Sequence, residues 1–280
     1  MKKYISTLWA LALLAASGGT TYGQIAPYVE LGAAGPQNWA VLDQGNFSIS
    51  DPTGYVTGNI GDVRGNVSTG GSAGVTGSVY LGSAASYSGP APSGGTVINS
   101  SLPGLDLASA NTAALYYDSL NLHANFTSAP SAGTVAAGVY NITGGWSPSG
   151  GTYNLTAGQV YVFNISGGNF APSGAFTLHD STPWDVIINV SGNGNVQSSG
   201  GGGTWPTLDA ILLTQGGNIQ LTPGQVNGEI IAAGPNSQIN IASRGAVNGV
   251  TPVPEPRTFI AGALLLLPLA ASVFRSRKSA

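Results

Sequence analysis

Residues 219–228 of this chain read IQLTPGQVNG, and residues 239–249 repeat the pattern as INIASRGAVNG. The two segments begin with Ile219 and Ile239, which stand 20 positions apart, and the offset grows to 21 at the end of the repeat. A period near 20 residues, with short alternating strands separated by Gly or Asn, is typical of one coil of a β-solenoid.

The same signal extends outward over residues 24–250, where short β-branched runs alternate with Gly, Asn and Ser turns. Leu212 and Ile231 add an offset of 19 residues. We therefore predict a mainly β fold, a parallel β-helix, whose inward Ile, Val and Leu side chains form columns from each coil to the next. Glycine and asparagine suit the corners because they tolerate positive φ. A β-sandwich is the alternative, although its hairpins would give a less regular rhythm.

One segment, about 106–124, has a helical rather than a strand pattern. Its apolar residues recur at helical spacing, so that one face holds Leu107, Ala110, Ala114, Tyr117 and Leu120. Asp106 is the predicted N-cap, and Pro103-Gly104 marks the entry. We predict one long amphipathic α-helix packed alongside the solenoid, covering a strip of its apolar wall.

Both chain ends carry processing signals rather than fold information. Residues 1–23 have a basic start, an apolar stretch and a small-residue exit, which predicts a secretory signal peptide. Residues 251–280 hold an apolar run at 259–274, interrupted by Pro268, and this run is shorter than the ~20 residues of a full membrane span. The motif residues around this predicted short membrane helix are Pro254, Glu255 and Pro256 before it and Arg275, Arg277 and Lys278 after it.

This tail closely resembles the PEP-CTERM sorting signal of Gram-negative bacteria. The resemblance implies recognition by an exosortase-type processing enzyme, after the export machinery has moved the chain and the tail has held it at the inner membrane. The basic cluster would stay on the cytoplasmic side. The resemblance further implies a final location at the cell surface or outside the cell. An ordinary C-terminal membrane anchor is the alternative.

Charge and cysteine content exclude several functions. Residues 24–253 contain ten acidic and two basic residues, Arg64 and Arg244, and therefore carry a net charge of −8. A phosphate-backbone binder needs a stripe of Lys and Arg, so we predict no nucleic-acid partner. The chain has no cysteine, which removes cysteine-based metal, redox and nucleophile chemistry.

A second resemblance covers most of the body and rests on Gly, Asn and aliphatic patterning. Its segments are 39–42, 56–61, the Ala-rich helix, 158–167, 186–192 and 226–234. The body resembles choice-of-anchor A surface domains and, more distantly, ice-binding-type β-helices that carry one long helix. The resemblance implies a right-handed β-helix displayed outside the cell.

Candidate sites are few. His123 and His179 are too far apart in sequence to suggest a zinc site, and we predict no metal or cofactor. The acidic residues are scattered singly, although two of them could still converge in space as a glycosidase pair. The body contains no Thr-x-Thr, the pattern of regular ice-binding rows. Trp146 and Trp205 lie next to Gly, Ser and Pro, which suits exposed loops that stack on sugars, and packing in the core or at a corner is the alternative.

From these observations we expect a non-enzymatic, exported surface or extracellular-matrix protein. Its low-charge wall of hydroxyl and amide groups would associate with exopolysaccharide. Two alternatives stay open: an ice-binding protein, and a β-helix enzyme that acts on extracellular glycan.

Overall fold

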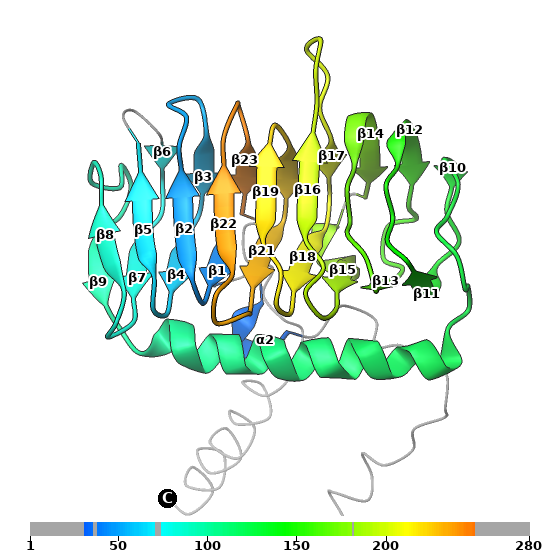
Figure 1. Ribbon diagram of the computed structural model, residues 1–280, viewed down its shortest axis with the longest axis horizontal. Coiled ribbons are helices and arrows are strands. Elements are labelled where there is room, and N and C mark those ends of the chain that lie inside the picture. The colour runs from blue at the N-terminus through cyan, green and yellow to red at the C-terminus, as the bar shows by residue number, and fades with distance from the viewer. Residues whose placement is uncertain (1–30, 36–37, 71–73, 181, 250–280) are drawn as a thin grey trace, which may run out of the picture. The chain divides into compact units, whose positions relative to one another are not determined.

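The computed structural model describes residues 31–249, apart from 36–37, 71–73 and 181. Short strands wind into stacked coils, and every pairing between named strands is parallel, which confirms the predicted parallel β-helix. Three walls enclose an apolar interior (Figure 1).

The first wall, which we call the core sheet, has nine strands. In spatial order they are β11 (Gly138–Thr143), β13 (Tyr161–Ser166), β15 (Val186–Val190), β18 (Ile211–Thr214), β21 (Glu229–Ala232), β1 (Val41–Asp43), β4 (Ile60–Asp62), β7 (Val79–Leu81) and β9 (Val97–Asn99). Every residue of β15, β18 and β21 is buried, so burial does not alternate along these largely apolar strands, although each holds one buried polar residue: Asn189, Thr214 and Glu229. Such continuous runs are typical of parallel strands that are covered on both faces.

The other two walls belong to one sheet of fourteen strands that turns at β14 (Ser173–His179), which pairs with both β16 and β17. On one side of the turn lies the threonine face, made of β14 with β10 (Gly133–Thr134), β12 (Ser149–Asn154), β17 (Thr207–Leu208), β20 (Gln225–Asn227), β23 (Ala246–Asn248), β3 (Tyr55–Thr57) and β6 (Gly74–Val75). On the other side lies the amide face, made of β16 (Val196–Ser199), β19 (Ile219–Thr222), β22 (Gln238–Ile241), β2 (Asn46–Ile49), β5 (Asn66–Thr69) and β8 (Ser86–Ser88).

The order of the coils in space differs from their order in the chain. The first coil does not end the stack, because β1 pairs with β4 on one side and with β21, near the end of the body, on the other. The same holds for β2 with β22 and for β3 with β23. We call this junction the seam; in Figure 1 the blue strands stand beside the orange ones. The expectation that each coil stacks on the next in sequence is therefore wrong at this point.

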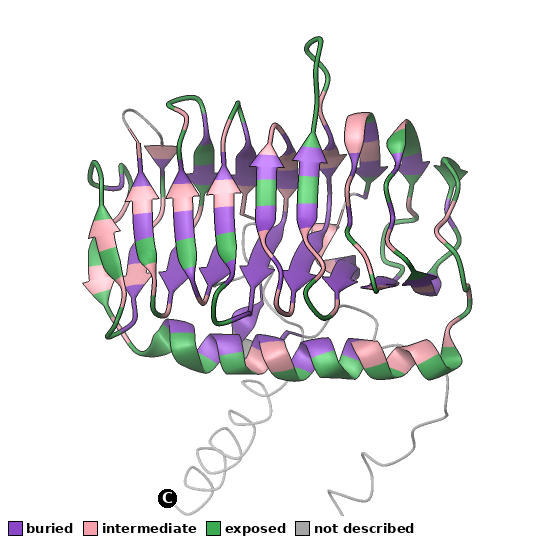
Figure 2. Cartoon of the chain, viewed as in Figure 1, coloured by how far each residue is buried: buried purple, intermediate pink, exposed green. Residues whose placement is uncertain are grey.

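Helix α2 (Leu102–Ser119) and the 3-10 helix η2 (Leu120–His123) run along the outer side of the core sheet and cross the seam (Figure 1). The predicted apolar face is confirmed for Leu107, Ala110, Ala114 and Tyr117, which are buried against the sheet (Figure 2), whereas Leu120 is half-buried and lies in η2. Two short 3-10 helices, η1 (Gly32–Ala34) and η3 (Pro183–Asp185), complete the described elements.

The predicted start of this helix is wrong. The helix begins at Leu102, with Pro103 in its first turn and Ser101 as the N-cap. Asp106 therefore lies inside the helix, where it is buried and accepts a hydrogen bond of 2.9 Å from Trp39 Nε1. Its carboxylate fastens the helix to the segment before β1 instead of capping the helix.

Strand register confirms most of the sequence repeat. Ile219 pairs with Ile239 and Val226 with Val247, as the period predicts. Leu212, however, pairs with Ile230, so its predicted equivalence with Ile231 is wrong by one residue. A slip of one residue changes the face of the sheet. Accordingly, Leu212 points into the interior, whereas Ile231 packs under α2.

Candidate functional site

Two parallel columns of side chains run along the outer side of the threonine face, and all of their members are exposed or half-buried except Ala246 and Asp209, which are buried. Alternate residues of each strand point outward, and the residue between them points into the core, as Val226 and Leu208 do. The first column, in register from strand to strand, contains Thr152, Thr177, Thr207, Gln225, Ala246 and Tyr55. The second contains Asn154, His179, Asp209, Asn227, Asn248 and Thr57.

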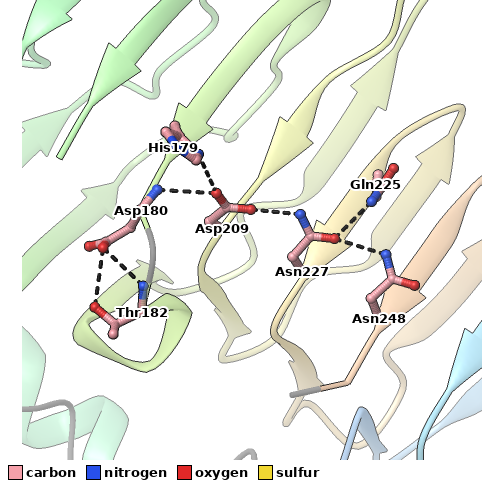
Figure 3. Close-up of polar contacts among 7 residues, drawn as sticks. All are labelled: His179, Asp180, Thr182, Asp209, Gln225, Asn227 and Asn248. Atoms are coloured by element: carbon pink, nitrogen blue, oxygen red, sulfur yellow. Dashed lines mark hydrogen bonds and ion pairs between the residues drawn. The ribbon is translucent and has the colours of Figure 1, made fainter. Parts of the chain in front are cut away.

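Hydrogen bonds join the middle of the second column into a row (Figure 3). His179 Nδ1 lies 2.9 Å from Asp209 Oδ2, and Asn227 Nδ2 donates to Asp209 Oδ1 at 2.6 Å. Asn227 Oδ1 accepts from Asn248 Nδ2 and from Gln225 Nε2, both at 2.8 Å. Side chains from four consecutive coils are therefore held in fixed positions along this face. We call these five residues the amide row; it lies on the threonine face and is separate from the wall called the amide face.

A loop with two further carboxyl groups lies beside the row. The backbone N–H of Asp180 donates to Asp209 Oδ2, and Asp180 Oδ1 accepts from the backbone N–H of Thr182 (Figure 3). The Thr182 hydroxyl donates to Asp185 Oδ2 at 2.6 Å. Burial raises the pKa of Asp185, although the hydrogen bond from the Thr182 side chain acts in the opposite direction and lowers it. Asp180 Oδ2 is buried without a hydrogen-bond partner.

Two other carboxyl pairs lie away from both exposed faces. Asp43 and Asp62 occupy paired positions in β1 and β4 and are fully buried at the corner toward the amide face. Burial raises the pKa of Asp43 to about 7 and that of Asp62 to about 6, although backbone N–H donors such as Gly45 act in the opposite direction. Each has one oxygen atom, Oδ2, without a hydrogen-bond partner.

The second pair lies between the core sheet and α2. Glu229 is fully buried, and neither of its carboxyl oxygens has a hydrogen-bond partner. Burial raises its pKa, and the neighbouring Asp106 raises it further. The convergence of carboxyl groups that the sequence left open therefore occurs at three places, and in each of them the groups are buried.

The amide face is the second exposed wall. Its central column is Ser88, Ser68, Ser48, Asn240, Gln220 and Gln197, without a charged residue. Along its edge, asparagine side chains bond the backbone of the next coil: Asn195 Oδ1 accepts from the N–H of Asn218, and Asn218 Oδ1 accepts from the N–H of Gln238. These side chains are occupied in holding the coils together.

The structure separates the two tryptophans that were predicted to lie in exposed loops. Trp146 is only 5% exposed and packs against the rings of Phe163, Phe170 and Phe176, so the prediction of its exposure is wrong. Trp205 is half-buried at the base of the loop between β16 and β17, which projects beyond the neighbouring coils (Figure 1). Of the two, only Trp205 has an appreciable part of its side chain exposed.

The predicted sorting residues Pro254, Glu255, Pro256, Arg275, Arg277 and Lys278 lie outside the described residues, as does the predicted signal peptide. Within the described part of the chain, no helix combines the length and the apolar character that a bilayer span requires. Among the same residues, no three His, Cys, Asp or Glu side chains gather where they could hold a metal ion.

Sequence reasoning missed the two columns of the threonine face. Their members follow one another at unequal intervals, for example 30 residues from His179 to Asp209, 18 to Asn227 and 21 to Asn248. A search for Thr-x-Thr within one strand cannot find a column built from separate coils. The repeated Val-Asn-Gly at 226–228 and 247–249 was the available signal, because its asparagines lie in the amide row.

Comparison with known proteins shows the fold. Two crystal structures of an ice-binding protein from an Arctic yeast (LeIBP) superpose with TM-scores of 0.58 and 0.56, at 19% and 21% identity. Both alignments cover 83% of this chain, and they cover 99% and 98% of the yeast chains. An ice-binding protein from an Antarctic Flavobacteriaceae bacterium aligns with a TM-score of 0.50 at 16% identity, over 85% of this chain and 52% of that one. No protein-family model and no curated protein sequence matches the chain.

Proposed function

We propose that this protein binds ice and that the threonine face makes the contact. The observation that carries the proposal is the in-register array of side chains on that face, most of which are Thr or Asn. Neighbouring parallel strands lie about 4.8 Å apart, so each column repeats its side chains at that spacing. A surface that repeats at a constant interval can hold water molecules in a lattice, which an irregular surface cannot.

The side chains of this array are also rigid. Thr152, Thr177 and Thr207 are β-branched, and their χ1 angles are therefore restricted. Next to them, Asn227 is fixed by hydrogen bonds on both sides. On the amide face, by contrast, Gln197 and Gln220 are long and exposed, so they would lose more rotamer freedom on binding. Rigidity therefore favours the threonine face.

The fold supports the same proposal. The crystal structures compared above are described as ice-binding proteins, and the likeness extends over most of the body. The absence of Thr-x-Thr rows counts against a regular ice-binding array. In this protein, however, columns of side chains that run from coil to coil take the place of Thr-x-Thr rows within single strands. For this reason we favour ice binding over the other candidates.

Thermal hysteresis of the purified protein tests the proposal. We expect measurable hysteresis and shaped ice crystals for the wild type, and loss of both in Thr177→Lys, whose bulky charge interrupts the first column. Gln220→Lys places the same side chain on the amide face and is the matched control, expected to keep the activity. A wild-type protein that neither lowers the freezing point nor shapes ice would refute ice binding. Equal loss in both variants would refute the assignment to this face.

A second candidate is the exported, non-enzymatic surface protein associated with exopolysaccharide. It is favoured by the half-exposed Trp205 on a projecting loop and by the absence of lysine from residues 24–253. We expect the purified protein to retain exopolysaccharide of its own cell, and Trp205→Ala to weaken that retention. Failure to bind any polymer on a glycan array would count against this role.

In both cases we propose that the chain is exported and that its C-terminal tail is recognised by an exosortase-type enzyme. The support is the order of Pro254, Glu255 and Pro256, the apolar run 259–274 and the terminal basic cluster. Mass spectrometry of the mature protein tests it, with loss of the tail as the expected result. A mature protein found inside the cell with both ends intact would contradict export.

A further inference from the structure

Asp209 occupies the second column of the threonine face, yet its side chain is only 8% exposed, because its neighbours in the amide row cover it. Its carboxylate accepts from three groups: His179 Nδ1, the backbone N–H of Asp180 and Asn227 Nδ2. We propose that Asp209 is a positioning residue that sets the direction of every hydrogen bond in the amide row. As a result, Asn248 presents an acceptor to water at one end of the row, and His179 presents one at the other end when its ring is neutral. The use of this pattern in ice contact rests on the proposed function.

On the Asn227 side of Asp209, the direction of the hydrogen bonds follows from the chemistry of the groups. A carboxylate only accepts hydrogen bonds, so the Asn227 amide must turn its NH₂ group toward Asp209. Asn227 Oδ1 then faces away, and Asn248 has to donate to it through Nδ2. The oxygen of Asn248 is left on the far side of the row, as Figure 3 shows. An asparagine can otherwise adopt either of two flipped orientations, and the carboxylate removes this freedom from two successive asparagines.

On the His179 side of Asp209, the direction of the hydrogen bond follows in the same way. Because Asp209 Oδ2 accepts, His179 Nδ1 carries the hydrogen, and in the neutral ring Nε2 is then an acceptor. The His179 side chain is 64% exposed, so this acceptor reaches solvent. The row therefore has donors directed inward to the carboxylate, an acceptor at Asn248 and, with the ring neutral, an acceptor at His179. A neutral amide at position 209 could not impose this order, because it is itself both donor and acceptor.

The test replaces Asp209 by asparagine, an isosteric change. The wild type should give one set of side-chain NH₂ signals for Asn227 in nuclear magnetic resonance spectra, with slow hydrogen exchange. Asp209→Asn should give more than one set, with faster exchange, and should lose most of the thermal hysteresis while the melting temperature is kept. Asp51→Asn makes the same chemical change in an exposed corner loop outside the row and should alter neither measurement.

A second variant covers the case in which Asp209→Asn does not fold. Asn248→Leu leaves the bond between Asn227 and Asp209 in place and removes the acceptor at one end of the row, so it should reduce thermal hysteresis with the Asn227 signals still in one set. Unchanged Asn227 signals in a folded Asp209→Asn protein would overturn the proposal, and so would full hysteresis in Asn248→Leu. If the wild type shows no hysteresis, ice binding fails, whereas the resonance measurement still decides the role of Asp209.

Discussion

At the corner between the core sheet and the amide face, successive coils approach each other too closely for any side chain. A Cβ atom on Gly65 would lie 1.5 Å from the carbonyl oxygen of Gly45, and one on Gly45 would lie 1.9 Å from that of Ser237. Neither glycine has a positive φ. Glycine was predicted at the corners of the coils, but the reason offered for it, tolerance of positive φ, does not apply at this corner.

This close approach leads to a prediction about one methyl group. Gly65→Ala should lower the free energy of unfolding by about 1–3 kcal/mol, because the coils must separate to admit the Cβ atom. Gly201→Ala is the control, since its Cβ would meet nothing within 4 Å in the projecting loop. Urea unfolding of both variants measures the difference. Equal stability of the two variants would show that the corner can relax.

The buried carboxyl groups make stability depend on pH. Aspartate in an unfolded chain titrates near pH 3.9, whereas Asp43 and Asp62 hold their protons up to about pH 7 and 6. Between these values the folded state binds more protons than the unfolded state, so the free energy of unfolding falls as the pH rises from about 4 to about 7. The raised pKa of Glu229 acts in the same direction.

We therefore expect a lower melting temperature at pH 8 than at pH 5. Asp43→Asn should flatten this dependence, because an amide does not titrate. The contribution of Asp43 is at most about 4 kcal/mol, at 1.36 kcal/mol for each unit of pKa shift. Differential scanning fluorimetry across this range measures it, and a melting temperature that rises toward pH 8 would contradict the assignment.

At the scale of elements, α2 contributes stability through its buried face alone. Leu107 is 3% exposed against the core sheet, whereas Leu105, two positions earlier on the same helix, is 64% exposed. Leu107→Ala should lower the free energy of unfolding by about 2–5 kcal/mol, and Leu105→Ala should change it by less than about 0.5 kcal/mol. Denaturant unfolding of the two variants measures the contrast. Similar losses in both would mean that the helix does not pack as described.

Periodic patterns predicted the elements well where a single element carries its own signal. The spacing of Leu107, Ala110, Ala114 and Tyr117 predicted the helix and its buried face, because that periodicity is local. The start of the helix was predicted wrongly because Asp106 has two possible uses, as an N-cap and as a buried acceptor. The choice between them depends on Trp39, which is far away in the sequence.

The candidate site could be predicted less well, because its residues come together only through the register of the coils. Nothing local to Thr152, Thr177 or Thr207 indicates that the three lie in one column. For Trp146, by contrast, a local signal was present but gave the wrong prediction. Its Gly and Pro neighbours indicate a loop, but the long coils around it create an interior wide enough to take the ring.

At the scale of the whole body, the seam and α2 join two groups of coils. Solenoids often unfold in steps, because each coil contacts only its neighbours. Here α2 contacts strands on both sides of the seam, among them β4 and β15. We therefore expect one cooperative thermal transition, with coincident curves from far-ultraviolet circular dichroism and tryptophan fluorescence. Two separated transitions would show that the seam is a weak joint.

The seam itself could not be predicted from the repeat. A periodic sequence indicates that coils stack, but it does not say where the stack begins. The partner of β1 is fixed by contacts such as the hydrogen bond from Ser237 Oγ to Asp43 Oδ1, between residues 194 positions apart. No pattern in a window of 20 residues contains that information.

The seam also has a consequence for the order of events during synthesis. The ribosome releases β1 among the first strands of the body, and β21 among the last. Throughout the time between them, one edge of β1 has no neighbour, and the middle layer of the stack stays open. The nascent chain can therefore lock into its final form only when translation of the body is almost complete.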